Sequence, residues 1–370
     1  MAIPFVDLQA QQAQVVDEIL PEIESVLRQG NFILGDPVSQ FEAEFAEYIG
    51  SDYAIGLDSG LSALKLALAA LGIGPGDEVI VPVNTFIATA AAVSFLGARP
   101  VFVEMDENTN NIDVTRIEAA INERTKAIMP VHLYGSPVDM DPVMAVANRY
   151  NLYVVEDAAQ AHGAMYKGKR VGSIGHAGAF SFYPAKNLGA AGDAGALVTN
   201  DPDVAERVKG MRNVGQVERY IHSLPPYNHR MDTLHAVVLS AKLKRLDGWN
   251  ASRDHLAGLY IENLPQGIIT PQRIDYGTQV WHLFVVRAER RDDLRAALQT
   301  EGIGTGIHYP VPLHLQPYYA DLGYQRGDFP VAEMVADEIV SLPMYAEMAE
   351  SDVRLVCERL SEFVLTANPT

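Results

Sequence analysis

The chain has 370 residues, 48% of them apolar, and a formal net charge of −19 at pH 7 without any run of basic residues. Nucleic acids and anionic membrane surfaces are bound through clustered lysine and arginine, so neither is an expected partner. The single cysteine, Cys357, excludes an internal disulfide and a cysteine metal cluster, and no signal peptide or membrane span is recognisable, so we expect a cytoplasmic protein without a metal site.

An amphipathic helix is predicted first, over residues 35–50, with Val38, Phe41, Phe45 and Tyr48 on one face. Seven short apolar runs follow and are predicted strands: Tyr53–Leu57, Glu78–Pro82, Pro100–Glu104, Ala127–Val131, Tyr153–Asp157, Gly178–Tyr183 and Gly195–Thr199.

The first six runs begin roughly 22–27 residues apart, with helix-like segments such as 60–72 and 85–97 between them. This spacing indicates βαβ units, and therefore a mostly parallel seven-stranded sheet covered by helices, an α/β fold. The last connection is about eleven residues long and rich in glycine. It is too short for a crossover helix, which favours an antiparallel seventh strand.

After the sheet, residues 233–249 predict one long helix, and the pattern then changes. A strand is predicted over 280–287, followed by helices over 291–304 and 329–343. We therefore expect a large domain over residues 1–249 and a smaller C-terminal α+β domain over 250–370.

Three polar groups follow strands of the predicted parallel sheet, whose carboxyl ends are the usual place for a ligand. The segment "SGLSAL" (59–64) opens a helix whose N–H groups can bind phosphate. Asp157 ends the fifth strand, with Gln160 and His162 beyond it, and Lys186 follows the sixth strand. Together they meet the needs of pyridoxal 5′-phosphate (PLP): a lysine for the Schiff base, a carboxylate for the pyridine nitrogen and a phosphate cradle. Taken singly, each could be a helix cap, a turn residue or a surface lysine.

Long stretches of the chain resemble the DegT/DnrJ/EryC1/StrS family of sugar aminotransferases, nearly from end to end. They include "GNFILGDPVSQFEAEFAEYIG", "VHLYGSPVDMD", "VVEDAAQAHGA", "SFYPAKNLGAAGDAGALVTND", "YNHRMDTLHAVVL" and "GIGTGIHYPVPLHLQPYY". The resemblance implies the fold-type I architecture of PLP enzymes, with pyridoxamine 5′-phosphate as the intermediate form of the cofactor.

The resemblance also implies roles for individual residues. Lys186 is the Schiff-base lysine and the proton-transfer base. Asn228 is expected to reach the cofactor phosphate of a neighbouring subunit, which implies a homodimer with shared active sites. The remaining cofactor contacts are Gly60, Leu61 and Ser62 (backbone to phosphate), Phe86 (stacking), Asp157 (pyridine nitrogen), Gln160 (ring hydroxyl) and Ser181 (phosphate).

The chain departs from the family pattern at three places. Many relatives have threonine at Leu61, glycine at Ala185 and a Gly-Asp-Gly-Gly run where this chain has "GDAG". None of these changes removes a required chemical group, although they alter the width of the pocket.

The variants "GLSAL" and "NTFIATAAAVS" resemble the subgroup that aminates C-3 of nucleotide-linked 3-keto-6-deoxyhexoses, typically dTDP sugars with L-glutamate as donor. That subgroup implies Tyr183, His308 and Tyr309 as hexose contacts. Arg219 and Tyr220 are candidates for the diphosphate or base of a substrate in the partner subunit. Ordinary packing remains the alternative for each of them.

Other functions stay open. One is amination of a 4-keto nucleotide sugar or a cyclitol ketone, and another is a regulatory homologue without catalysis. Related dehydratases carry histidine in place of the Schiff-base lysine, so Lys186 argues against that chemistry. The simpler interpretation of His162 is a residue of the pocket wall. The simpler interpretation of Arg230 is a side chain that stabilises its loop.

Overall fold

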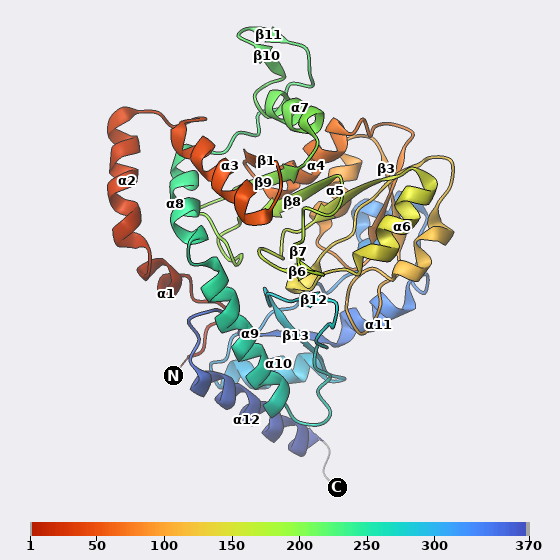
Figure 1. Cartoon of the computed structure of the whole chain (residues 1–370). Coiled ribbons are helices and arrows are strands. Elements are labelled where there is room, and N and C mark those ends of the chain that lie inside the picture. Colours follow the sequence, from red (N-terminus) through yellow and green to blue (C-terminus); the bar gives the residue numbers. More distant parts are fainter. Residues whose placement is uncertain (1, 368–370) are drawn as a thin grey trace.

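The computed structural model describes residues 2–367, and a seven-stranded sheet lies at its centre (Figure 1). The strand order is β1-β9-β8-β5-β4-β2-β3. Only β9 runs against its neighbours within this sheet, which confirms the mostly parallel sheet and the antiparallel seventh strand. The bounds are β1 Tyr53–Leu57, β2 Glu78–Pro82, β3 Arg99–Val103, β4 Thr125–Ile128, β5 Tyr153–Asp157, β8 Ala177–Ser181 and β9 Gly195–Thr199.

Helices cover both faces of the sheet, as the βαβ spacing predicts. Within β2, Val79 and Val81 pack in one core and Ile80 packs in the other, because successive side chains of a strand point to opposite faces. The first core includes residues of α4 (Gly60–Ala70), α5 (Ile87–Ser94) and α7 (Pro202–Arg212). The second includes residues of α3 (Asp36–Ile49), α6 (Met140–Tyr150) and α8 (Thr233–Leu243).

The C-terminal part of the chain has its own core around Tyr260, Phe284 and Leu360. The helices and strands of this C-terminal part are α9 (Leu246–Asn263), β13 (Phe284–Arg287), α10 (Arg291–Thr300), α11 (Pro330–Glu338), β14 (Ile339–Leu342) and α12 (Glu350–Ala367). Because α9 runs through position 250, the chain enters this part inside a helix, and the division into two domains at that position stays a prediction.

Two predicted helices of this half of the chain are wrong in their extent. The single helix over 233–249 is two helices, α8 and α9, separated at Lys244 and Arg245. The helix over 329–343 ends at Glu338, and Ile339–Leu342 form β14, which pairs with β13. The second error has a visible cause, because strand pairing with the distant β13 overrides the local helical periodicity.

The prediction for the fourth strand extended to Val131, but β4 ends at Ile128. Pro130 follows closely and has no N–H to donate to a strand ladder. Its carbonyl instead accepts a hydrogen bond from the N–H of Asp157, at 2.9 Å.

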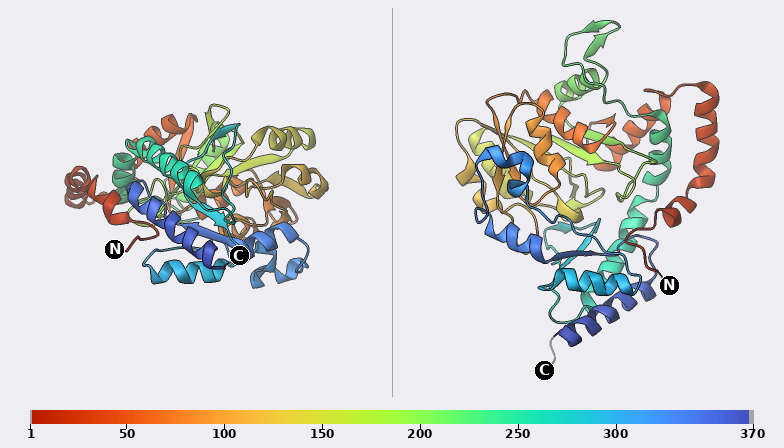
Figure 2. Two further views of the ribbon diagram at one scale, coloured as in Figure 1. Left: turned by 90° about the horizontal axis from the view of Figure 1, so that it is seen from below. Right: turned by 180° about the vertical axis from the view of Figure 1, so that it is seen from behind.

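The remaining elements lie around this body. Helix α2 packs against α8, and the hairpin of β10 and β11 projects beyond α7 (Figures 1 and 2). The helices and strands not yet placed are α1 Leu8–Ala13, α2 Val16–Gln29, β6 Met165–Tyr166, β7 Lys169–Arg170, β10 Gln216–Glu218, β11 Ile221–His222 and β12 Gly277–Thr278. Within residues 2–367, 3₁₀ helices cover Val114–Arg116, Glu118–Ala120, Leu133–Gly135, Leu313–Leu315 and Pro317–Leu322. None of the helices in the described part has the length and apolar character that a bilayer crossing needs.

Candidate active site

A cavity of about 480 Å³ lies at the carboxyl ends of β5 and β8, where a parallel sheet is expected to bind its ligand. The N-terminal segment and residues 282–283, 308–309 and 344 of the C-terminal part complete its lining. Ten predicted site residues come together here: Gly60, Leu61, Phe86, Asp157, Gln160, Ser181, Tyr183, Lys186, His308 and Tyr309.

One end of the cavity is formed by the first turn of α4 lying against Ser181. A Cβ atom on Gly60 would stand 2.7 Å from the Cβ of Ser181, so only glycine allows this approach. The N–H groups of Gly60 and Leu61 belong to the first turn of the helix and have no partner within it. Ser62 is different, because the Oγ of the N-cap residue Ser59 accepts from its N–H at 3.1 Å. The cradle is therefore made by Gly60, Leu61 and the Ser181 hydroxyl.

The carboxylate of Asp157 is buried at the floor of the cavity. Its Oδ2 accepts from the Thr89 hydroxyl at 2.8 Å, and its Oδ1 accepts from the N–H of Ala159 at 3.2 Å. Burial raises the pKa of Asp157 above its ordinary value, and these two hydrogen bonds oppose the rise. A cationic ligand group beside it would relieve the unfavourable burial of the charge. Thr89 was not foreseen from the sequence, since a threonine within an alanine-rich helix gives no signal.

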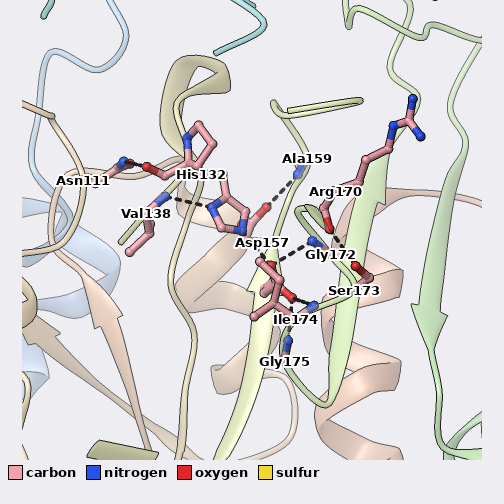
Figure 3. A network of polar contacts seen from close by, with 12 residues as sticks. Asn111, His132, Val138, Asp157, Ala159, Arg170, Gly172, Ser173, Ile174 and Gly175 are labelled. Carbon is pink, nitrogen blue, oxygen red and sulfur yellow. Dashed lines mark hydrogen bonds and ion pairs between the residues drawn. The ribbon is translucent and has the colours of Figure 1, made fainter. Parts of the chain in front are cut away.

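The neighbouring carboxylate, Glu156, faces a different set of partners. It accepts from the N–H groups of Gly172 (2.8 Å), Ile174 (2.7 Å) and Gly175 (2.7 Å). It also receives Nε2 of His132 at 3.0 Å, while Nδ1 of that ring accepts from the N–H of Val138. Figure 3 shows this network beside Asp157, with the 172–175 loop wrapped around it. All of these groups are buried or partly buried, so the network fixes the loops behind β5.

Lys186 stands in the turn after β8, where its N–H donates to the Tyr183 carbonyl at 2.8 Å. Burial lowers the pKa of Lys186 to about 8, and the nearby carboxylate of Asp157 acts in the opposite direction. An amine with this pKa is partly neutral at physiological pH and can act as a nucleophile or as a base.

A chain of contacts joins Gln160 to the predicted sugar-binding residues. Gln160 accepts from the N–H of Tyr134 at 2.7 Å and donates to the Tyr309 hydroxyl at 3.1 Å. The ring of Tyr309 lies 5.4 Å from that of Phe86. His308 Nδ1 pairs with Ser341 Oγ at 2.7 Å, and burial lowers the pKa of His308 to about 4, so this ring is neutral at pH 7.

Four predicted site residues are not among the residues that line the cavity of their own chain: Ser62, Arg219, Tyr220 and Asn228. Arg219 and Tyr220 are at the projecting hairpin, where Tyr220 is 77% exposed, and Asn228 is bridged to Asn213 at its base. His162 does not line the cavity either. It is buried between Phe180 and Phe182, and burial lowers its pKa to about 3, so His162 is a neutral core side chain rather than a wall residue of the cavity.

Several lining residues were missed in the sequence. Phe5 and Val6 come from the N-terminal segment, and His282, Leu283 and Met344 come from the C-terminal part. No local pattern marks them, because they reach the cavity only through the tertiary fold.

Comparison with known proteins gives the same relationship over nearly the whole chain. The model of the DegT/DnrJ/EryC1/StrS aminotransferase family matches residues 13–361. The dTDP-3-amino-3,4,6-trideoxy-alpha-D-glucose transaminase of Streptomyces venezuelae is 47% identical over 98% of this chain and 96% of its own. The pleiotropic regulatory protein of Geobacillus stearothermophilus is 45% identical over 98% and 99%. A crystal structure of S. venezuelae DesV with a ketimine intermediate superposes with a TM-score of 0.96, at 47% identity and 98% coverage of both chains.

Proposed function

The chain belongs to the DegT/DnrJ/EryC1/StrS aminotransferase family, and from this premise we propose that it transfers an amino group from L-glutamate to C-3 of a dTDP-linked 3-keto-6-deoxyhexose. The observation that carries the proposal is the meeting of Lys186, Asp157 and the Gly60–Ser181 cradle in one cavity.

The residues of this cavity fit PLP, the cofactor of the family. Gly60, Leu61 and Ser181 would hold its phosphate, and Asp157 would face its pyridine nitrogen. A buried carboxylate with a raised pKa is a suitable partner for a cationic ring nitrogen. When bound, PLP supplies an electron sink for the charge that develops on carbon during amino transfer.

Lys186 would carry protons during both halves of the reaction. Its Nζ removes the proton from Cα of glutamate in the first half and delivers a proton to C-3 of the sugar in the second. A base works best when its pKa is close to the working pH, and the lowered pKa of Lys186, about 8, meets this condition.

The sugar would lie between Lys186 and the side chains of Tyr183, His308 and Tyr309. His308 is neutral at pH 7, so it can bind a sugar hydroxyl without introducing a charge. The Tyr309 hydroxyl stays protonated, because burial raises its pKa to about 12. Uncharged polar groups of this kind suit a hexose.

We further propose a homodimer with shared active sites. Glutamate brings two carboxylates and the nucleotide brings a diphosphate, yet no arginine is among the cavity-lining residues of the described chain. Arg219, Tyr220 and Asn228 lie outside this cavity, and the hairpin projects from the molecule (Figure 2). A second copy could bring these residues to the opening. The single, buried cysteine fits the cytoplasmic location that we propose for this enzyme.

The test is the visible spectrum of the PLP-loaded protein, titrated with L-glutamate and then with a dTDP-3-keto-6-deoxyhexose. We expect glutamate to bleach the absorbance of the cofactor and the 3-keto sugar to restore it. Restoration by a 4-keto sugar alone would move the reaction to C-4. Absence of any response to amino donors would favour a regulatory role, as in the name of the G. stearothermophilus relative.

A further inference from the structure

The N-terminal segment is fixed along one side of the cavity like an additional strand. Ile3 bridges Ile303, with its N–H donating to the Gly302 carbonyl at 2.9 Å and its carbonyl accepting from Gly304 at 2.8 Å. The side chain of Ile3 is only 3% exposed. The two residues that line the cavity, Phe5 and Val6, are therefore held by a backbone that is hydrogen-bonded to the C-terminal part.

Phe5 is packed closely against that part of the chain. Its ring stacks on His308, with ring centroids 5.6 Å apart and planes inclined by 17°. A Cβ on Gly304 would stand 2.6 Å from the backbone nitrogen of Phe5, and one on Gly306 would stand 3.4 Å from its ring. The Gly-Thr-Gly sequence at 304–306 thus leaves the space that Phe5 occupies.

Several of the residues that line the cavity with Phe5 are apolar, while the ring that stacks on Phe5 is that of His308. Val6, Leu61, Leu283 and Met344 are in the same lining and offer no hydrogen-bonding side chain beyond the weakly accepting sulfur of Met344. The exposed aromatic residues of the lining, Phe86 and Tyr183, are 51% and 55% exposed, whereas Phe5 is partly buried against the core. A ligand group that packs against Phe5 is therefore shielded from water and finds no side-chain donor in this set.

We propose that Phe5 and Val6 form a specificity-determining apolar wall that receives the C-6 methyl group of the deoxyhexose. The inference rests on the proposed function and goes beyond it by assigning the selection of a 6-deoxy sugar to these two residues. A hydroxyl at C-6 would lose its water against Phe5 and Val6, which offer it no hydrogen bond, whereas a methyl group gains apolar contact there. The neighbouring ring of His308 already has its Nδ1 paired with Ser341 Oγ.

The experiment compares kcat/KM for two dTDP-3-keto sugars that differ only in the presence of a hydroxyl at C-6. The wild type is expected to prefer the 6-deoxy sugar by roughly ten- to a hundredfold, the range for a small group in an apolar pocket. In Phe5→Ala this preference should fall by about tenfold, mainly through loss of activity on the 6-deoxy sugar. Calorimetric binding of the two 3-amino products should show the same change in the ratio of dissociation constants.

Two variants serve as controls. Phe5→Leu keeps an apolar side chain and should retain most of the preference. Phe95→Ala removes a 60% exposed ring that is outside the cavity lining and should leave both sugars unaffected. If Phe5→Ala slowed both sugars equally, the ring would only be supporting His308, and the assignment would be overturned. If the wild type aminated neither sugar, the proposed function itself would fail.

Discussion

Glu156 and Asp157 are adjacent carboxylates at the end of β5, and both are buried. Glu156 points toward the 172–175 loop, where three backbone N–H groups and His132 surround it. Asp157 points to the cavity, with one hydroxyl and one N–H as partners and a raised pKa. Figure 3 shows Asp157 with Ala159 near His132 and the loop that carries Gly172, Ile174 and Gly175. A buried carboxylate whose oxygens are fully hydrogen-bonded within the protein supports the local fold. A buried carboxylate with fewer partners remains available to a ligand.

Two lysines, the buried Lys242 and the partly buried Lys186, repeat the contrast. Burial lowers the pKa of both Lys186 and Lys242 to about 8. The ammonium of Lys242 donates to Gln11 Oε1 at 3.1 Å and to the Gly189 carbonyl at 2.9 Å. Lys186 faces the cavity instead. A shifted pKa therefore does not identify a catalytic group unless the geometry leaves that group accessible to a substrate.

We expect the largest difference in turnover when the same substitution is made at each of the two lysines. Lys186→Met should reduce turnover by a factor on the order of 10⁴, because it removes the base that moves the proton. Lys242→Met should keep turnover within about threefold but lower the free energy of unfolding by about 1–3 kcal/mol, since two acceptors lose their donor. Single-turnover kinetics and urea denaturation measure the two effects. Substantial steady-state activity in Lys186→Met would refute its assigned role.

The two carboxylates should separate activity from stability. Asp157→Asn should lower the rate by a factor on the order of 10²–10³, since it removes the charge that we propose to face the ring nitrogen. The cofactor-free variant should be as stable as the wild type or more stable at pH 7. The pKa of Asp157 is raised in the folded chain, so the wild type loses stability, relative to the variant, as the pH rises above 3.8 toward that pKa. Urea midpoints measured between pH 4 and 8 test this, and a destabilised variant at pH 7 would count against it.

Glu156→Gln should show the opposite result. The amide nitrogen cannot accept the hydrogen bonds that one carboxylate oxygen receives, so we expect a loss of about 3 kcal/mol in the free energy of unfolding. The fraction of the Glu156→Gln protein that folds should retain the change in cofactor absorbance on addition of glutamate. Unchanged stability together with loss of that response would mean that Glu156, rather than Asp157, acts on the cofactor.

The smallest effect concerns the hydroxyl that supports Asp157. Thr89→Val keeps the shape of the side chain but removes the donor to Oδ2 of Asp157. Loss of this hydrogen bond should cost about 1 kcal/mol, which corresponds to about a fivefold lower affinity for PLP. Ser94→Ala on the same helix removes a hydroxyl that donates to the Ala90 carbonyl and does not line the cavity, so it is the matched control. Spectroscopic titration with PLP compares the two variants, and equal affinities would remove Thr89 from the site.

Much of this arrangement could be predicted from the sequence, because it depends on local periodicity. Apolar runs separated by helical segments are local patterns, and they predict a parallel sheet whose strand ends must meet at one edge. Asp157 ends one such strand and Lys186 follows another, so their proximity could be inferred without coordinates. Similarity to the family added the roles that were expected for Gly60, Gln160 and Ser181.

Other features were decided only by the tertiary structure. The strand β14, the position of Thr89 under Asp157 and the wall formed by Phe5 all depend on segments far apart in the chain. The different environments of Glu156 and Asp157 are another example, since the sequence shows two adjacent acids and the partners of Glu156 come from a separate loop. Local periodicity reports which face of an element is apolar. It does not report which distant group will meet that face, and this meeting decides whether a buried charge supports the fold or serves the site.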